Sequence, residues 1–270
     1  MANLNVEVLG KQNLVAVLRT ETDGQMAETH ECEIEWTDGS ITRAYVKRYS
    51  TTRQLALTNE ITGYIVANGC DLPVPNHIGF IQLPSTCFPA SHGNYIDWCF
   101  VASTVAGTTP KSVFSPANIA HSKTLLDLVA NWNKIESVVA FDDWVANQDR
   151  NMGNLVVQDK QNIFLIDHGN LPVKLNWDIS DLDPTMEAKS ILMSMLYKFG
   201  CVPLPVKSGI AKATQEHSKV YNSVSNELQH WWNQLLVGDT ARINALDAFL
   251  AARANLGTTR ISKNYNMLVV

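Results

Sequence analysis

Two kinds of hydrophobic periodicity divide this chain, and that division constrains its fold more than any other feature of the sequence. In residues 1–104 the apolar positions form short runs such as LVAVLRT and SITRAYVKRY, which are rich in β-branched side chains and favour strands. From about residue 121 onward they recur at spacings of three and four, which is typical of amphipathic helices. Strands followed by helices predict an α+β fold. We therefore expect a β-rich lobe over residues 1–104 and a mainly helical lobe over residues 105–270.

The first lobe is expected to hold a hairpin, a third strand and one helix. HECEIEW and SITRAYVKRY flank a turn at residues 37–39, and their alternation predicts two antiparallel strands, the second of which contains Lys47. Residues 94–104 form a further strand candidate. A helix should run from about residue 52 to residue 68, with Glu60 in its middle. Taken singly, a strand lysine is typical of a solvated edge and a helix glutamate of a surface charge.

The second lobe should consist mostly of helices with one hairpin among them. One or two helices are expected over residues 121–147, and more between about residues 181 and 255. Between these regions, NLVV and NIFLI are short apolar runs split by the turn-like tetrad QDKQ. Residues 154–166 therefore predict a β-hairpin inside the helical lobe.

Three oxygen-bearing side chains surround the predicted hairpin. Asn154 begins its first strand, Asp167 follows its second strand, and Asp149 lies in the loop that enters it. The two open ends of an antiparallel pair are neighbours in space, so these side chains should converge. Carboxylate and amide oxygens are ligands that Mg²⁺ prefers, usually together with phosphate oxygens. Each residue could instead cap a turn, because Asp and Asn favour loops.

The ordered set Lys47, Glu60, Asp149, Asn154 and Asp167 resembles the site of the protein-kinase-like superfamily. NQDRNMGN followed by LIDHG is similar to the N-x-D-R-x-x-x-N and I-D-x-G motifs of HipA-like kinases and of phosphoinositide 3- and 4-kinases. AYVKRY resembles their lysine strand, LTNEITGYIVANGCDLPVPN resembles the helix-and-proline segment of small HipA-like kinases, and VASTVAG resembles their hinge. The resemblance implies a two-lobed protein-kinase-like fold with a nucleotide-binding β-rich lobe and a catalytic helical lobe.

Carried over position by position, the resemblance implies an ATP and Mg²⁺ site. Asp149 would orient or deprotonate the acceptor hydroxyl, and Asn154 and Asp167 would hold Mg²⁺. Lys47 would bind the ATP phosphates, positioned by Glu60. The remaining nucleotide contacts would come from the phosphate-covering residues Thr22, Asp23, Gly24 and Gln25 and from the adenine-facing residues Ala102, Ser103 and Thr104.

The sequence departs from the family pattern at three places. Residues 147–149 read Asn-Gln-Asp where many protein kinases carry His-Arg-Asp, and Asn151 stands where many relatives carry a histidine. His168 occupies the position of the phenylalanine in Asp-Phe-Gly, so an aromatic activation switch is not expected. Arg150 would orient the loop or touch phosphate.

Composition narrows the class of partner. The net charge of −5 disfavours direct nucleic-acid binding, and the absence of an apolar run of about 18 residues disfavours a membrane span. The five cysteines contain no CxxC pair, so neither a disulfide framework nor a structural zinc site is expected, and a reducing cytoplasm fits.

We therefore expect a cytoplasmic kinase that transfers the γ-phosphoryl group of ATP to a Ser or Thr hydroxyl of an unidentified protein. Because small HipA-like enzymes include toxin kinases, a growth-arrest role with an antitoxin or regulatory partner is a further expectation. The alternatives are an ATP-binding kinase-fold protein that interacts without turnover, a lipid kinase, and a nucleotidyl transferase on the same scaffold.

Overall fold

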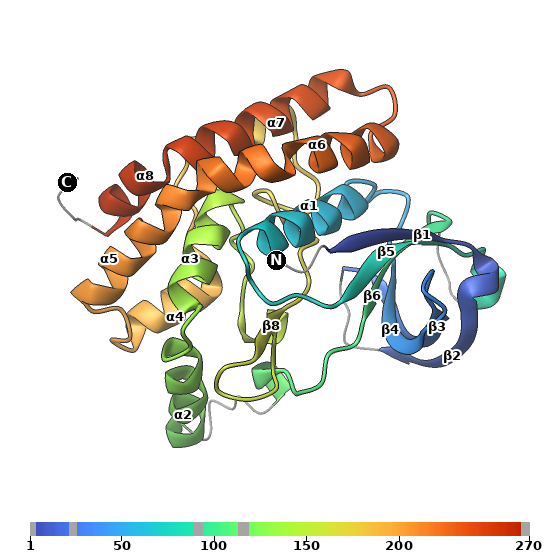
Figure 1. Cartoon of the computed structure of the whole chain (residues 1–270), viewed down its shortest axis with the longest axis horizontal. Helices are drawn as coiled ribbons and strands as arrows, with labels where there is room; N and C mark the ends of the chain where they lie inside the picture. The colour runs from blue at the N-terminus through green and yellow to red at the C-terminus, as the bar shows by residue number, and fades with distance from the viewer. Residues whose placement is uncertain (1–3, 22–25, 89–93, 113–118, 266–270) are drawn as a thin grey trace. The chain divides into compact units, whose positions relative to one another are not determined.

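The chain forms an α+β structure that divides into two compact units (Figure 1). The residues described by the computed structural model are 4–21, 26–88, 94–112 and 119–265. The first unit comprises Met1–Leu57 and Pro75–Val105, and the second comprises Thr58–Val74 and Ala106–Val270. The first unit ends at Val105, and the segment 58–74 belongs to the mainly helical unit.

The first unit is built on a mixed sheet with the order β1-β5-β6-β4-β3-β2 in the described part of the chain. β1 runs parallel to β5, and all other neighbouring strands are antiparallel. The strands are β1 (Asn5–Leu9), β2 (Leu14–Glu21), β3 (Glu28–Glu35), β4 (Ile41–Arg48), β5 (His77–Gln82) and β6 (Trp98–Ser103). The predicted hairpin is confirmed as β3 and β4, and the third strand candidate as β6. β5 was not predicted, because the two prolines that precede it indicated only the end of a helix.

The two faces of β4 differ in burial, as its alternating sequence predicted. Ala44, Val46 and Arg48 are buried on the face that packs into the hydrophobic core, whereas Lys47 lies on the other face and is half-buried. Arg48 is paired with Glu28 across the strands. Lys47 therefore lies on the face of the sheet opposite to this core.

The parallel strand β1 is held by the buried carboxylate of Glu7. One oxygen of this carboxylate lies 3.1 Å from Nδ1 of His77 at the start of β5, and the other accepts the backbone N–H of Thr37 at 2.7 Å. A Cβ built on Gly79 would lie 2.1 Å from the backbone oxygen of Glu7, so only glycine allows the two strands to approach this closely. These contacts explain why β1 pairs with β5 across a long sequence separation.

The helix that follows β4 begins later than predicted. α1 spans Ala56–Gly69 instead of starting near residue 52. The backbone of Ser50 forms a bridge with Tyr95, and the N–H of Thr51 donates to the backbone oxygen of Asn94 at 3.0 Å. Because residues 50 and 51 pair with another extended segment, their backbone cannot enter the first helical turn.

The second unit consists of α-helices around one short hairpin in the described part of the chain. Besides α1, the helices are α2 (Ile119–Ala130), α3 (Ile135–Trp144), α4 (Ile191–Lys198), α5 (Leu204–Ala213), α6 (His217–Leu235), α7 (Thr240–Asn255) and α8 (Gly257–Asn264). The hairpin strands are β7 (Leu155–Val157) and β8 (Ile163–Leu165), which confirms the predicted hairpin. Figure 1 shows α6 and α7 packed side by side. The late helices begin at Ile191, not near residue 181, and α8 extends beyond the predicted end.

Short 3-10 helices complete the elements of both units. They are Lys11–Asn13, Ser85–Cys87, Pro110–Ser112, Met152–Asn154, Ile179–Asp181 and Thr214–Glu216.

A buried charge network fixes the last two helices to α3. The carboxylate of Asp143 accepts hydrogen bonds from Nε and Nη2 of Arg260, at 3.1 and 2.7 Å. Arg253 donates through Nε to the backbone oxygen of Trp144 at 2.8 Å. Burial lowers the pKa of Arg253 to about 10, and Asp143 opposes that shift. The network positions the C-terminal end of α3, from which the loop that carries Asp149 departs.

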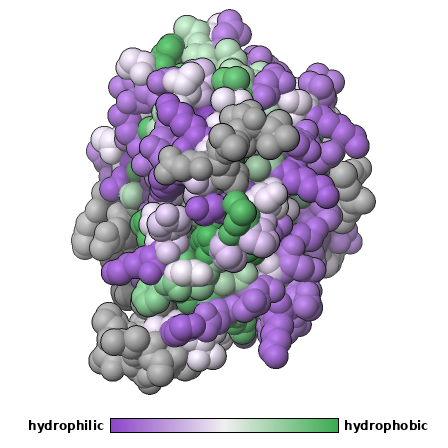
Figure 2. All heavy atoms as spheres, turned by 90° about the vertical axis from the view of Figure 1, so that its left-hand side faces the viewer, coloured by the Kyte–Doolittle hydropathy of each residue, from purple (hydrophilic) through white to green (hydrophobic). Residues whose placement is uncertain are grey.

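Exposed apolar side chains gather on and beside α4 and α5. Ile191, Tyr197, Phe199 and Leu204 are all exposed there. Figure 2 views the side that carries α4 and α5 and shows apolar side chains there with polar ones around them. None of the helices among the described residues combines the length and the apolar character that crossing a membrane requires.

Candidate functional site

The residues predicted to form a metal site lie at the open end of the β7–β8 hairpin. The backbone oxygen of Asn154, just before β7, accepts the N–H of Ile166, just after β8, at 3.1 Å. Asp167 follows Ile166 directly, so the hairpin brings Asn154 and Asp167 to neighbouring ends of its two strands. Asn154 is buried, whereas Asp167 is exposed. The backbone thus brings Asn154 and Asp167 to the same end of the hairpin.

The loop that carries Asp149 is shaped by asparagine side chains. Oδ1 of Asn147 accepts the backbone N–H of Asp149 at 3.1 Å. Asn151 donates through Nδ2 to the backbone oxygen of Asp149 and accepts the N–H of Gly153, both at 2.8 Å. Oδ1 of Asn154 accepts the N–H of Asn151 at 2.9 Å. These short-range bonds satisfy backbone groups that no helix or strand could satisfy, and they fix the loop in one conformation.

A buried guanidinium lies beneath this loop. Arg150 donates through Nη1 to the backbone oxygens of Asn154 and Ile166, at 3.3 and 3.0 Å. Its Nε donates to Oδ1 of Asp142 at 3.2 Å, and its Nη2 lies 3.2 Å from Nδ1 of His168. The expectation that Arg150 orients the loop agrees with these contacts. Because its guanidinium bonds inside the unit, Arg150 serves the structure of the loop and not a ligand.

The partner of Arg150 is an enclosed carboxylate. Burial raises the pKa of Asp142 to about 6, while the Arg150 guanidinium and the Asn147 amide oppose that rise. Asp142 lies on α3, so the ion pair ties α3 to the loop and to the open end of the hairpin. The position of the loop thus depends on a charge pair that solvent does not reach.

The turn at residues 167–169 is held by α1. The backbone N–H of His168 donates to Oε2 of Glu60 at 2.8 Å, and Glu60 is fully buried. The His168 ring packs edge-on against Tyr64, with ring centroids 4.5 Å apart. A Cβ built on Gly63 would lie 2.4 Å from Cβ of His168, so the helix must carry glycine at that position. Glu60 thus contacts the turn that carries Asp167. The backbone of Asp167 lies in the left-handed region, with a φ of 60°.

One further side chain of α1 secures the segment after this turn. Asn59 donates through Nδ2 to the backbone oxygens of Gly169 and Leu175, at 2.7 and 2.9 Å. Its Oδ1 accepts the indole N–H of Trp177 at 3.0 Å. Asn59 is fully buried, and both N–H groups and the oxygen of its amide have partners in these three contacts.

The residue types at the hairpin end fit a magnesium ion bound to phosphate. Oδ1 of Asn154 already accepts one N–H, but an amide oxygen has a second lone pair. Asp167 adds a carboxylate, and Mg²⁺ is usually held by one or two such side chains together with phosphate oxygens and water. Among the described residues, no three His, Cys, Asp or Glu side chains lie close enough to hold a metal by themselves. A metal held by Asn154 and Asp167 would therefore need oxygens from a ligand.

The residues expected to contact the adenine lie at the end of β6 in the first unit, and much of their backbone is engaged in the sheet. Ala102 pairs with β4 on one side and β5 on the other. Thr104 donates both its backbone N–H and its hydroxyl to the backbone oxygen of Arg43, at 2.8 and 3.2 Å. The hydroxyl of Ser103 accepts the N–H of His77 at 3.2 Å. An adenine contact here would have to use backbone groups other than the N–H of Thr104.

The other first-unit residues of the predicted site are Lys47 and the phosphate-covering loop. Lys47 lies on β4, where it pairs with Thr29 and Phe100 of the neighbouring strands. The predicted loop residues Thr22, Asp23, Gly24 and Gln25 lie outside the described residues.

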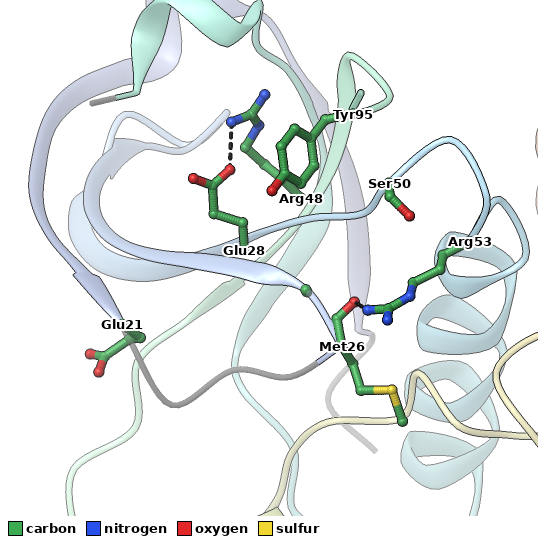
Figure 3. Close-up of a pocket in the computed structure, with 8 residues that line it drawn as sticks. Glu21, Met26, Glu28, Arg48, Ser50, Arg53 and Tyr95 are labelled. Atoms are coloured by element: carbon green, nitrogen blue, oxygen red, sulfur yellow. Dashed lines mark hydrogen bonds and ion pairs between the residues drawn. The ribbon is translucent and has the colours of Figure 1, made fainter. Parts of the chain in front are cut away.

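A pocket of about 370 Å³ lies in the first unit near the ends of β3 and β4 (Figure 3). Arg48 pairs there with Glu28 at 2.7 Å, and its guanidinium lies 4.4 Å from the ring centroid of Tyr95. Arg53 donates to the backbone oxygen of Met26. Arg48 points to the face of the sheet opposite to the one that carries Lys47. Arg48 and Arg53 both already have partners within the unit. We therefore assign this pocket no ligand.

Asn170 contacts a residue of the candidate site, and this contact was not predicted from the sequence. Its Nδ2 donates to Oδ2 of Asp149 at 2.7 Å. The two residues lie far apart in the sequence, so neither periodicity nor motif spacing could pair them. The sequence feature that could have indicated Asn170 is its position directly after Gly169, close to Asp167 and just beyond the second strand of the hairpin.

No protein-family model matches this chain, and no curated protein matches it.

Proposed function

We propose that this chain is an ATP- and Mg²⁺-dependent phosphotransferase with a two-lobed protein-kinase-like fold, and that it phosphorylates a Ser or Thr hydroxyl of a protein. One observation carries the proposal: the hairpin brings Asn154 and Asp167 to neighbouring strand ends, next to a loop in which asparagine side chains bond both backbone groups of Asp149. Phosphoryl transfer depends mainly on positioning the reactants and on stabilising charge. Carboxylate and amide oxygens such as those of Asp149, Asn154 and Asp167 serve these purposes, by orienting the nucleophile and by holding the metal.

In this proposal Asp149 receives the proton of the acceptor hydroxyl. The hydroxyl oxygen forms a bond to the γ-phosphorus, the bond from the γ-phosphorus to the bridging oxygen breaks, and its electron pair leaves with ADP. Asn154 and Asp167 would hold Mg²⁺, which supplies charge neutralisation on the phosphate oxygens when bound. Arg150, Asn147 and Asn151 keep the loop in place but do not touch the reacting atoms.

Lys47, Glu60 and the residues Ala102, Ser103 and Thr104 keep their assigned roles as proposals. Glu60 would position Lys47, and its carboxylate also holds the turn that carries Asp167 by accepting the N–H of His168. Lys47 would bind phosphate, which predicts that Lys47→Met weakens ATP binding while the protein stays folded.

Incubation of the protein with γ-labelled Mg-ATP and dephosphorylated casein tests the proposal. With the wild type we expect label on casein or on the protein itself, and a mass gain of one phosphoryl group. Asp149→Ala and Asp167→Ala should both abolish the transfer. The matched control Asp159→Ala removes an exposed carboxylate at the far turn of the same hairpin and should retain it.

The other outcomes identify the competing functions. ATP binding without any transfer would favour an interaction protein on this scaffold. Label on phosphoinositide vesicles but not on protein would favour a lipid kinase. A mass gain of one nucleotidyl group would favour a nucleotidyl transferase. Each of these results would overturn the proposed protein kinase activity.

A further inference from the structure

We infer that Asn170 is a positioning residue for the Asp149 carboxylate, which it holds by one oxygen so that the other oxygen faces the acceptor hydroxyl. The inference rests on the proposed function, because Asn170 acts on the reaction only through Asp149. No motif in the sequence assigns a role to Asn170.

The contact itself is short and directional. Nδ2 of Asn170 donates to Oδ2 of Asp149 at 2.7 Å, a distance typical of a hydrogen bond to a charged acceptor. Both residues are half-buried, so water competes less for the bond than at the surface. Among the described residues, Asn170 is the hydrogen-bond donor to the side chain of Asp149, and Oδ1 of Asp149 accepts no hydrogen bond.

The backbone around Asn170 is held from several directions. The oxygen of Gly169, just before it, accepts Nδ2 of Asn59 at 2.7 Å. The N–H of Val173, three residues after it, donates to the backbone oxygen of Ala146 at 3.0 Å. Since Ala146 lies between α3 and the loop that carries Asp149, both partners of the bond are anchored to the same part of the unit. The bond is therefore preorganised and does not have to form when a substrate binds.

The chemistry favours an amide at this position. A carboxylate that accepts a proton in the reaction needs a fixed orientation. A neutral amide N–H can fix that orientation without placing a second charge beside the carboxylate. Asn170 thus orients the Asp149 carboxylate with an uncharged donor.

The test compares three Asn170 variants by steady-state turnover of γ-labelled Mg-ATP. Asn170→Ala removes the bond, and a misplaced carboxylate should lower kcat about 10- to 100-fold while the KM for ATP changes by less than about twofold. Asn170→Asp keeps the shape but places a second carboxylate beside Asp149, so it should lower kcat at least as much. Asn170→Gln keeps the donor on a longer side chain and should restore part of kcat.

Asn162→Ala is the matched control. Asn162 donates through Nδ2 to Oδ2 of Asp159, also at 2.7 Å, but in the exposed turn at the far end of the hairpin. Removing that bond should leave kcat unchanged. The thermal midpoint of Asn170→Ala should lie within about 2 °C of the wild type, which separates positioning from unfolding.

A double-mutant cycle decides whether Asn170 acts through Asp149. In single-turnover measurements, Asn170→Ala should have no further effect once Asp149→Asn is present. Full additivity of the two effects, or an unchanged kcat in Asn170→Ala beside an active wild type, would overturn the inference alone. An inactive wild type that still binds Mg-ATP would overturn the proposed function and the inference with it.

Discussion

The guanidinium of Arg150 and the carboxylate of Asp142 form an enclosed ion pair, with Nε and Oδ1 3.2 Å apart. Both side chains are at most 2% exposed. The same guanidinium reaches the backbone oxygens of Asn154 and Ile166. One buried cation therefore sets the spacing between α3, the loop of Asp149 and the open end of the hairpin. High salt should affect this pair far less than it affects ion pairs on the surface.

Removal of this cation should destabilise the protein strongly. Arg150→Met leaves the carboxylate of Asp142 buried without its partner, which typically costs about 3–5 kcal/mol in the free energy of unfolding. Urea unfolding followed by tryptophan fluorescence measures the loss. The double variant Asp142→Leu, Arg150→Met removes both charges and should recover part of it.

Lys123→Met is the comparison for a surface pair. Lys123 and Asp127 lie one helical turn apart on α2 and are both exposed. Loss of this ion pair in Lys123→Met should change the free energy of unfolding by less than about 1 kcal/mol. Equal losses in Lys123→Met and Arg150→Met would show that the buried pair does not organise the unit.

The sequence predicted the local parts of the site better than the contacts between distant parts. The hairpin with Asn154 and Asp167 could be predicted because strand alternation and turn composition are properties of neighbouring residues. The bond from Asn170 to Asp149 could not, since it depends on how the segment after the hairpin folds back. For the same reason, the bond from the His168 N–H to Glu60 carries no signal in the sequence.

The elements of the fold divide in the same way. The β3–β4 hairpin follows from the composition of its strands and turn. The late start of α1 does not, because the capping residues near its expected start pair instead with residues 94 and 95. The parallel pairing of β1 with β5 depends on the Glu7 carboxylate and on Gly79, whose roles appear only once the strands are side by side.

His217 should make the protein sensitive to acid. Its ring stacks on Trp144 with centroids 4.5 Å apart, and burial lowers its pKa to about 3, helped by Arg260. A free histidine titrates near pH 6.5, so below that pH the unfolded chain binds a proton that the folded chain does not. The contribution of His217 to stability therefore falls as the pH falls from about 6.5 toward 3.

The variant His217→Phe keeps the ring stacking and removes the titration. Between about pH 7 and pH 4.5 the wild type should lose about 2–3 kcal/mol more in the free energy of unfolding than this variant. Urea unfolding at the two pH values measures the difference. His230 is exposed on α6, and His230→Phe should keep the pH dependence of the wild type. If the free energy of unfolding changes equally with pH in His217→Phe and the wild type, His217 is not the source of the acid sensitivity.

Gly63→Ala should destabilise the protein although alanine is the better helix former. Alanine favours a helix over glycine by about 1 kcal/mol. Its Cβ would lie 2.4 Å from Cβ of His168, so either α1 or the turn that carries Asp167 must move. Such overpacking typically costs about 1–3 kcal/mol. A net gain in the urea midpoint would show that the turn yields without cost.

ATP affinity should depend on Mg²⁺ through the two residues at the hairpin end. In isothermal titration calorimetry, the wild type should bind ATP more weakly after EDTA treatment, because a metal held by Asn154 and Asp167 would add its positive charge to the binding of the phosphates. In Asp167→Ala, the ATP affinities with Mg²⁺ and after EDTA treatment should differ much less, because one of the two proposed metal ligands is gone. Asp159→Ala, at the opposite end of the hairpin, should show the full difference. ATP binding that is equally tight with and without the metal in the wild type would rule out a metal site formed by these oxygens.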